Sequence, residues 1–182
     1  KFNNVENINI SGLNNSDNQI VLKNLKNLNL ESIFSLDERA ISKIMDANTL
    51  IEKYIIFKKY PSTLDIEVKK TNFLANINKN GSTFIIGSNA KLIKKNQLRN
   101  DLPFIFGNPE INEFINLKKI IDMSNISYNE IKNFYFFKSK RWDLELADNT
   151  VIKLSENDIK ASLSNAYKFL NNNNFENIKV ID

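Results

Sequence analysis

Two carboxylates, Asp143 and Glu145, are the residues of this sequence with the clearest capacity for acid–base chemistry. They alternate with Trp142, Leu144 and Leu146, so a β-strand would place both on one face with Cβ atoms about 7 Å apart. Retaining glycosidases hold their two carboxyl groups about 5 Å apart, so such a pair could serve glycoside hydrolysis. The alternation by itself predicts the solvated face of a half-buried strand, and we favour that interpretation.

Two serine–lysine pairs could also carry catalysis, namely Ser155 with Lys153 and Ser139 with Lys140. No Ser-x-x-Lys motif opens a predicted helix, and the four glycines of the chain form no oxyanion loop. The chain has no cysteine and no histidine, which excludes thiol nucleophiles, zinc fingers, disulfides and every triad with a histidine base. We therefore expect a protein that is not an enzyme and that uses no cofactor and no metal.

The composition is that of a folded protein without a nucleic-acid site. The 182 residues suit one large or two small domains, and 42% of them are hydrophobic, which is enough for a buried core. The net charge of +4 is spread over interspersed acids and bases, without a basic patch that would bind nucleic acid. No window approaches the ~18 apolar residues of a membrane span. The sequence begins with Lys1 rather than methionine, so we expect that an upstream segment has been removed.

Residues 1–72 are predicted to follow the order strand, helix, helix, strand, strand. Apolar residues at helical spacing follow Ser16 and Asp37, which are candidate N-caps. Pro61 and Ser62 are typical of a tight turn between two strands. The expected elements are a strand at Val5–Leu13, helices at Ser16–Leu28 and from Asp37 to about Asn48, strands at Leu50–Lys59 and Leu64–Lys70, and a linker at Thr71–Phe73.

From Phe73 onward the sequence predicts strands with a few helices. Asn80-Gly81 is a strong hairpin signal, and capping-box spacing at Ser127–Glu130 and Ser155–Asp158 predicts a short turn and a last helix. The expected elements are strands at Leu74–Ile77, Thr83–Ile86, Phe134–Phe137, Arg141–Leu146, Val151–Leu154 and Ile178–Asp182, a helix at Pro109–Met123, and a last helix carrying Ile159, Leu163 and Leu170. The pattern as a whole is that of an α+β protein.

Five landmarks, in this order along the chain, resemble the signatures of the bacterial cell-division family FtsQ/DivIB. They are Ile8, Ile10 and Gly12; Ile33, Phe34, Leu36 and Asp37; the hairpin with Tyr60, Pro61, Thr63, Leu64, Ile66, Val68 and Ala75; Leu102–Gly107; and Lys140–Thr150. Lys70 and Phe73 stand where the family usually has Glu and Pro. Asn149 replaces the usual glycine, which asparagine tolerates because it readily adopts left-handed backbone conformations.

The resemblance implies an α+β fold, with an N-terminal POTRA domain (β-α-α-β-β) at residues 1–72 and a mostly antiparallel β-domain with helices at 73–182, its last strand truncated. It implies a non-catalytic scaffold of the divisome that helps regulate septal wall synthesis. This would be the periplasmic part of a single-pass inner-membrane protein at the division septum, with the membrane reached only through a missing N-terminal anchor. The implied partners are FtsB- and FtsL-like coiled-coil proteins, with other divisome proteins at the POTRA domain and no nucleic acid.

The partner surface is expected mainly in the second domain, because an unpaired sheet edge can accept a partner strand by β-augmentation. Lys138, Lys140 and Arg141 could meet acidic residues of a partner or simply solvate a strand end. The apolar stripe of the last helix is more typical of core packing, and Phe57 and Tyr60 are expected to pack in the core or a turn. The partner-binding candidates are Lys140, Arg141, Ala166, Tyr167, Leu170, Val180 and Ile181, with Phe57, Lys59 and Tyr60 as a secondary set beside a POTRA edge.

The sequence is also compatible with two other functions. A POTRA-bearing component of protein transport or outer-membrane assembly would also be a binding module, but such proteins carry repeated POTRA domains and the sequence suggests one. A small periplasmic hydrolase would use Asp143 and Glu145, and replacing them by asparagine and glutamine would then abolish its activity.

Overall fold

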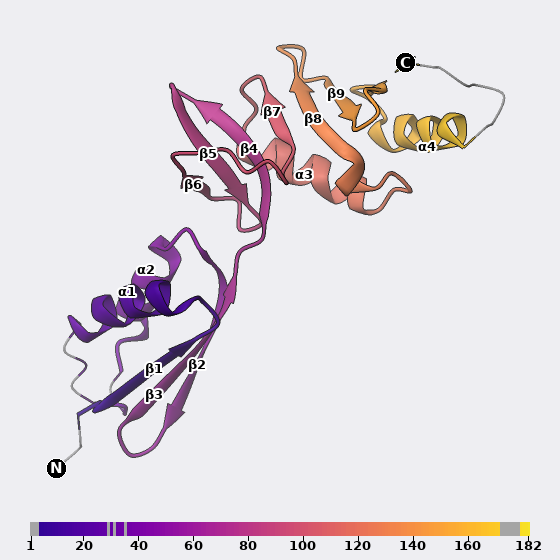
Figure 1. Ribbon diagram of the computed structural model, residues 1–182. Coiled ribbons are helices and arrows are strands. Elements are labelled where there is room, and N and C mark those ends of the chain that lie inside the picture. The colour runs from indigo at the N-terminus through magenta and orange to yellow at the C-terminus, as the bar shows by residue number, and fades with distance from the viewer. Residues whose placement is uncertain (1–3, 29, 31, 35, 172–178) are drawn as a thin grey trace. The chain divides into compact units, whose positions relative to one another are not determined.

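The computed structural model describes residues 4–28, 30, 32–34, 36–171 and 179–182 (Figure 1). The chain divides into two compact units, Lys1–Asn72 and Phe73–Asp182. Each unit has its own hydrophobic core, built between one face of a sheet and two α-helices.

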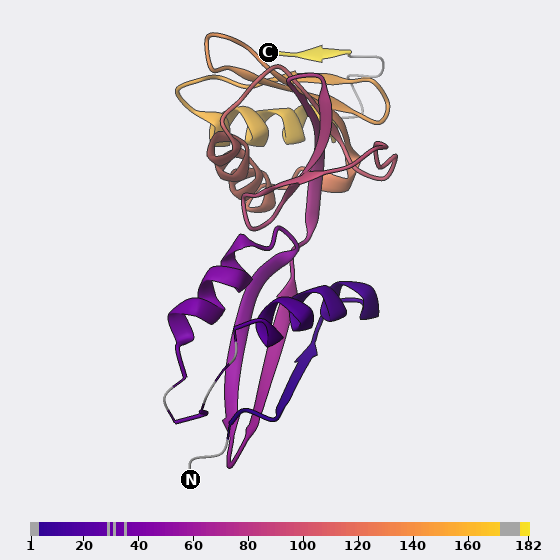
Figure 2. The same cartoon turned by 90° about the vertical axis from the view of Figure 1, so that its left-hand side faces the viewer.

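The first unit has the predicted order strand, helix, helix, strand, strand. Its elements are β1 (Asn7–Ser11), α1 (Asn15–Lys26), α2 (Glu38–Ala47), β2 (Ile51–Lys59) and β3 (Thr63–Lys70). The sheet has the order β1-β3-β2, in which β1 runs parallel to β3 and β2 runs antiparallel to it. Both helices cover one face of this sheet (Figure 2), so the predicted β-α-α-β-β arrangement is confirmed.

Short polar side chains begin both helices of the first unit. Asp37 is the N-cap of α2 as predicted, and its Oδ1 accepts a hydrogen bond from the amide of Arg39 at 3.0 Å. Helix α1 begins earlier than predicted, because its N-cap is Asn14, which accepts from the amide of Asp17 at 2.8 Å. The spacing around Ser16 therefore predicted the right turn of chain but the wrong capping residue.

Gly12 lets the chain leave β1 against the core of the first unit. Its φ is +104°, and a Cβ built there would lie 1.7 Å from the carbonyl oxygen of Val68. A residue with a side chain would be strained by this φ and would also collide with β3, so both conditions require glycine. The core that this turn borders is formed by Val21, Leu25, Ile41, Met45, Ile51, Leu64, Ile66 and Val68.

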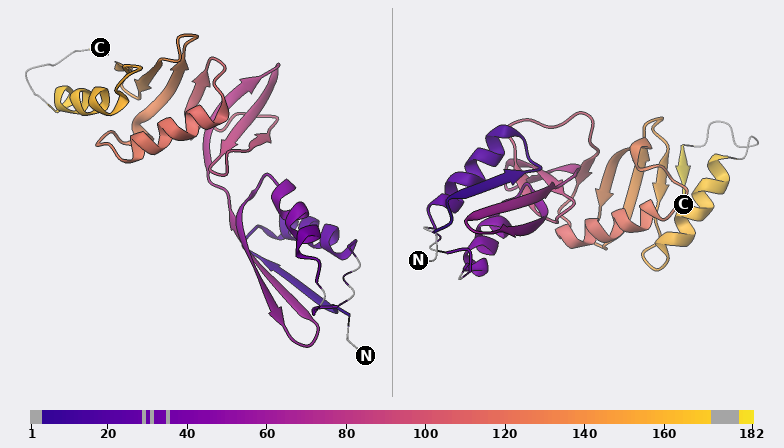
Figure 3. Two further views of the ribbon diagram at one scale, coloured as in Figure 1. Left: turned by 180° about the vertical axis from the view of Figure 1, so that it is seen from behind. Right: turned by 90° about the horizontal axis from the view of Figure 1, so that it is seen from below.

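The second unit is an eight-stranded mixed sheet with two helices on one face (Figure 3). Its elements are β4 (Phe73–Lys79), β5 (Ser82–Gly87), β6 (Leu92–Lys94), β7 (Phe104–Phe106), α3 (Ile111–Asp122), the 3-10 helix η1 (Tyr128–Glu130), β8 (Ile131–Phe136), β9 (Trp142–Leu146), β10 (Val151–Lys153), α4 (Ile159–Leu170) and β11 (Val180–Ile181). The strand order is β11-β10-β9-β8-β7-β4-β5-β6. Antiparallel pairs outnumber the parallel pairs β10–β11, β7–β8 and β4–β7, which agrees with the expected mostly antiparallel sheet.

Turn residues in the second unit behave as their chemistry predicts. Asn80 (φ +50°) and Gly81 (φ +74°) close the β4–β5 hairpin in left-handed conformations. Asn149 (φ +67°) occupies the β9–β10 turn, so the prediction that asparagine can replace glycine there is confirmed. Helix α4 begins at Ile159, because Asp158 is its N-cap and accepts from the amide of Ala161 at 2.9 Å.

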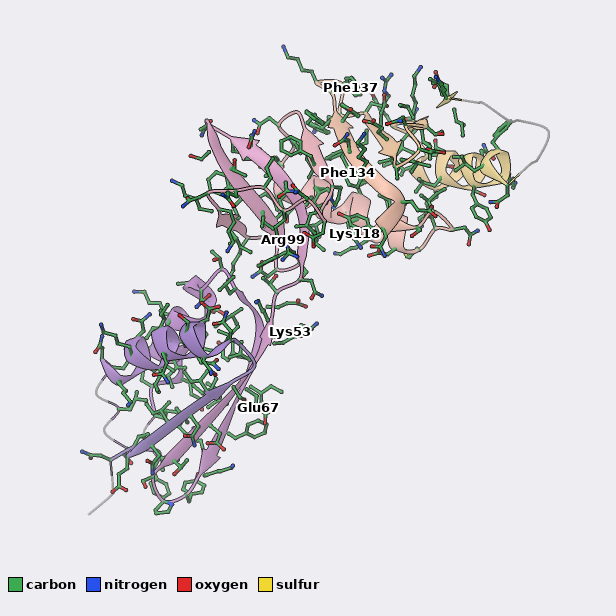
Figure 4. The ribbon with its side chains drawn as sticks, viewed as in Figure 1. Lys53, Glu67, Arg99, Lys118, Phe134 and Phe137 are labelled. Carbon is green, nitrogen blue, oxygen red and sulfur yellow. The ribbon has the colours of Figure 1, made fainter. Side chains whose placement is uncertain are left out.

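An aromatic group fills the centre of the second core. The Phe134 side chain is fully buried (Figure 4), and its ring centroid lies 5.4 Å from that of Phe114 and 6.2 Å from that of Trp142, both in edge-to-face geometry. Trp142 and the alternate residues of β9 face helices α3 and α4. Asp143 and Glu145 therefore lie on the opposite face of the sheet.

Candidate protein-interaction surface

Side chains that are mostly polar form two rows across β8–β11, on the sheet face opposite the helices. One row contains Tyr135, Asp143, Lys153 and Asp182, and the next contains Asn133, Glu145, Val151 and Val180. Asp143 is only 6% exposed and Glu145 is partly buried, so the prediction of a solvated strand face was wrong. An ion pair with Arg141 engages Asp143, and hydrogen bonds from Asn133 and Tyr135 engage Glu145.

Arg141 neutralises Asp143 from two positions earlier on the same chain. Its Nε and Nη2 donate to the two carboxylate oxygens at 3.0 and 3.3 Å. Its guanidinium carbon also lies 4.6 Å from the ring centroid of Phe137. Burial raises the pKa of Asp143 above its ordinary value, although the charge and hydrogen bonds of Arg141 oppose that shift. The Arg141 guanidinium therefore mainly forms contacts within the fold.

Glu145 is held by neutral donors from β8. The hydroxyl of Tyr135 and the amide nitrogen of Asn133 donate to its Oε2 at 2.6 and 2.8 Å. The hydrogen bond from Tyr135, followed by that from Asn133, lowers the pKa of Glu145, and the same contact raises the pKa of Tyr135. Hence the pKa values of two carboxylates on one strand, Glu145 and Asp143, are shifted in opposite directions.

We expect Glu145→Gln to make the free energy of unfolding of the second unit less dependent on pH in the acidic range. The pKa of Glu145 is lower in the folded than in the unfolded chain, so its stabilisation is present above the unfolded value of about 4.3. That stabilisation is lost as the pH falls through the folded value, and we expect the wild type to lose about 1 kcal/mol more than the variant on acidification. Urea denaturation followed by Trp142 fluorescence at several pH values measures this difference.

Glu156→Gln is the matched control, because Glu156 is exposed in the turn before α4. Its stability profile should run parallel to that of the wild type. Parallel profiles for Glu145→Gln as well would show that the hydrogen bonds from Tyr135 and Asn133 do not stabilise the folded state.

The hairpin end between β8 and β9 presents exposed positive charge. Lys138 and Lys140 are both exposed, and the Lys140 ammonium lies 3.7 Å from a carboxylate oxygen of Glu113. Phe137, 39% exposed, lies at the same end (Figure 4). Of the predicted basic cluster, the two lysines rather than Arg141 are the charges available to a partner. We call Lys138 and Lys140 the basic hairpin end.

Strand β11 is one edge of the eight-stranded sheet. Among the described residues, no strand pairs with its outer side. Val180 is 52% exposed, whereas the Ile181 side chain packs in the core, so Ile181 can offer only its main chain to a partner. A hydrogen-bonded ion pair between Lys153 and Asp182, at 3.0 Å, ties the end of β11 to β10.

Helix α4 separates its candidates into buried and exposed residues. Ala166 is fully buried with Leu163, so its side chain is not available to a partner, contrary to its place in the predicted set. Tyr167 and Leu170 are 38% and 40% exposed rather than packed in the core. The buried stripe of α4 is narrow, and a step of one residue around the helix turns Tyr167 outward.

The secondary candidates at the end of β2 are exposed. Phe57 is 42% exposed, so the prediction that it packs in the core or a turn was wrong, whereas Tyr60, 63% exposed, lies in the β2–β3 turn as predicted. The Tyr60 ring lies 4.9 Å from that of Phe34, which is itself 59% exposed. Sequence reasoning matched Phe34 to a family landmark but gave it no role, because nothing local places it beside Tyr60.

One face of β2 combines apolar and basic residues. Lys53, Ile55, Phe57 and Lys59 alternate on its exposed side, and Lys59 forms an ion pair with Asp65 of β3. Figure 4 shows Lys53 on this hairpin. Ile55, 58% exposed, was not among the predicted residues, although the period-2 alternation with Phe57 could have identified it.

Comparison with known proteins assigns the chain to a protein family. The family description "POTRA domain, FtsQ-type" matches residues 3–70, and "Cell division protein FtsQ/DivIB, C-terminal" matches residues 69–182. The chain belongs to the FtsQ/DivIB family. The resemblance inferred from the five landmarks is therefore confirmed.

A curated FtsQ/DivIB relative covers almost the whole chain. "Cell division protein FtsQ" of Rickettsia typhi is 27% identical over 185 residues, an alignment that spans 98% of this chain and 68% of the relative. Among solved structures, the major extracytoplasmic domain of DivIB from Geobacillus stearothermophilus aligns with 52% of this chain and 86% of its own, at 10% identity and a TM-score of 0.39.

FtsQ/DivIB proteins are cell-division proteins of the divisome and the inner membrane. In the part of this FtsQ/DivIB chain that the structure describes, no helix is long and apolar enough to cross a bilayer. The described residues also contain no group of three or more acidic side chains placed to hold a metal ion. The described residues of this chain include an edge strand, β11, on which the Val180 side chain is exposed.

Proposed function

We propose that this FtsQ/DivIB chain is a non-catalytic scaffold that gathers divisome proteins and helps control septal wall synthesis. The observation that carries the proposal is the outer edge of β11, which no described strand covers, together with exposed Val180 on that strand and exposed Tyr167 and Leu170 on α4. An unpaired edge offers main-chain donors and acceptors to an extended partner, and neighbouring side chains give specificity. The proposed partners are FtsB- and FtsL-like coiled-coil proteins.

A scaffold role agrees with the state of the residues that could have done chemistry. Asp143 is paired with Arg141, and Glu145 accepts from two neutral donors. Lys153 of the possible serine–lysine pair binds Asp182 instead. These contacts support a structural role for the groups, and they leave a carboxylate hydrolase without an available pair.

We further propose that residues 1–72 and 73–182 act as separate modules. The first would be a POTRA domain and the second a partner-binding β-domain. Both would lie in the periplasm at the division septum, with a single membrane anchor upstream. The open face of β2, with Ile55 and Phe57 between Lys53 and Lys59, is the proposed secondary docking surface for other divisome proteins.

Calorimetry with the periplasmic segment of an FtsB-like protein from the same genome tests the main proposal. We expect Lys138→Glu with Lys140→Glu to weaken binding about tenfold at low salt, and the difference to shrink as salt screens the charges. Tyr167→Ala should weaken binding with little dependence on salt, because its contribution is apolar contact. The control is Lys94→Glu with Lys119→Glu, two exposed lysines outside this end of the sheet.

Each outcome of this experiment decides a separate point. Failure of the wild-type chain to bind the FtsB-like segment would overturn the partner assignment. Equal salt slopes for the lysine variant and Tyr167→Ala would remove the electrostatic role of the basic hairpin end. Loss of binding in the control would show that net charge, rather than this surface, governs association.

A further inference from the structure

A groove lies where η1, the β9–β10 turn and the end of α4 meet. It has a volume of about 490 Å3. The Ile126 and Leu146 side chains, each 5% exposed, form its apolar floor, and the polar residues Asn125, Ser127 and Asn171 also line it. Its walls carry the exposed side chains of Tyr167 and Leu170, so the groove offers apolar surface to a partner.

Two carboxylates stand on the rim of this groove. Glu130, the last residue of η1, and Asp148, in the β9–β10 turn, both line it and are both exposed. A main-chain hydrogen bond from Ala147 to the carbonyl of Glu130, at 2.8 Å, joins the two rim segments. This main-chain hydrogen bond therefore keeps Glu130 and Asp148 on the same rim, whichever rotamers their side chains adopt.

The rim charges are not neutralised within the fold. Among the described residues, neither Glu130 nor Asp148 forms an ion pair, and the hydrogen bond that Asp148 accepts comes from the amide of Thr150. Lys132 is directed elsewhere: it donates to Asn149 at 3.2 Å and lies 3.7 Å from Glu145. The groove thus combines a negatively charged rim with apolar lining, in a chain whose net charge is +4.

The acidic rim and the apolar floor together favour one kind of ligand in the groove. An aliphatic side chain would fill the floor between Ile126 and Leu146, and an adjacent lysine or arginine would meet the rim carboxylates. A nucleic acid would be repelled by the same acids. The basic hairpin end selects the opposite charge, so the two surfaces would admit a partner in one orientation and oppose the reverse.

We infer that this groove binds a basic, aliphatic segment of a partner protein, a leucine or isoleucine beside a lysine or arginine. The inference rests on the proposed scaffold function and deepens it, because Tyr167 and Leu170 belong both to the proposed partner surface and to the groove. The acidic rim is the new element: it assigns Glu130 and Asp148 as determinants of partner choice and orientation.

The first test measures binding of the FtsB-like segment to variants of the rim. Glu130→Lys and Asp148→Lys should each weaken binding severalfold, and together about tenfold, with an effect that declines at high salt. Glu156→Lys makes the same charge change on an exposed acid outside the groove and should leave binding unchanged. Circular dichroism of each variant verifies that the fold is retained.

The second test does not depend on the identity of the partner. An amphipathic peptide of leucine and lysine, added to the isotopically labelled chain, should shift the NMR signals of Ile126 and Leu146. Its leucine–glutamate counterpart should not, although a net charge of +4 would favour the acidic peptide if attraction were non-specific. The double rim variant should lose the response to the lysine peptide.

The outcomes separate the groove from the scaffold proposal. If the FtsB-like segment binds the wild type and the rim variants equally, the groove inference is overturned and the scaffold proposal stands. If that segment does not bind at all, the partner assignment fails and the peptide experiment decides the groove alone. Equal responses to both peptides, or shifts confined to other residues, would overturn the inference.

Discussion

Phe134→Ala should destabilise the second unit by about 3–5 kcal/mol, which is the usual cost of removing a fully buried aromatic ring. The ring is 0% exposed and contacts Phe114 and Trp142 edge-to-face, so its removal opens a cavity between the sheet and helix α3. Urea denaturation followed by tryptophan fluorescence measures the loss selectively, because the single tryptophan of the chain, Trp142, lies in this unit.

Phe137→Ala is the matched control for this prediction. It removes the same side chain just beyond the end of β8, where Phe137 is 39% exposed and contacts Arg141. We expect a loss of about 1 kcal/mol or less, since exposed substitutions away from the core have small effects. Similar losses for the two variants would mean that the aromatic group around Phe134 does not hold this core together.

Gly12→Ala should destabilise the first unit by about 3 kcal/mol, from the sum of two effects. A non-glycine residue at φ +104° is strained by about 1–2 kcal/mol, and a Cβ placed 1.7 Å from the Val68 carbonyl forces the backbone of β1 away from β3, as overpacking does at a similar cost. Thermal or urea denaturation followed by circular dichroism measures the effect.

Ser11→Ala is the matched control, because Ser11 is the exposed residue of β1 next to Gly12. It should change the free energy of unfolding by less than about 0.5 kcal/mol. A wild-type-like Gly12→Ala would show that the turn after β1 can rearrange freely. The Trp142 signal of the second unit serves as an internal reference in both variants.

Local chemistry in the sequence predicted most of the fold. Period-2 alternation identified β9 and placed Trp142 on the face opposite Asp143 and Glu145, and turn residues located the hairpins at Asn80-Gly81 and Asn149. Helix boundaries were less exact, as at Asn14, because a cap depends on which of several nearby polar side chains reaches the free amides.

Burial on the open faces of the sheets could not be predicted in this way. Asp143 is covered by Arg141, two positions earlier in the chain, and it faces Lys153 and Tyr135 on the neighbouring strands; strand register is a non-local property. Phe57 was predicted to be packed and is exposed instead. Nothing in its local sequence shows which face of the three-stranded sheet lacks helices.

The structure shows which of the predicted partner-binding residues are exposed, and their role in binding stays a prediction. Tyr167 and Leu170 became candidates through the family resemblance, since the local pattern of α4 alone predicted core packing. Ala166 was misplaced because one step around a helix separates core from surface. Glu130 and Asp148 were not predicted as a pair, since only the backbone contact between η1 and the β9–β10 turn brings them to one rim.

The parallel pairing of β1 with β3 constrains the order in which the first unit can be assembled. Contacting residues such as Asn9 and Asp65 lie 56 positions apart, so β1 has no sheet partner until nearly the whole unit has been synthesised. The β2–β3 hairpin, by contrast, needs only a short turn. A chain emerging from its N-terminus must therefore keep β1 unpaired while the hairpin forms, and the entry of β1 is the event that completes the sheet.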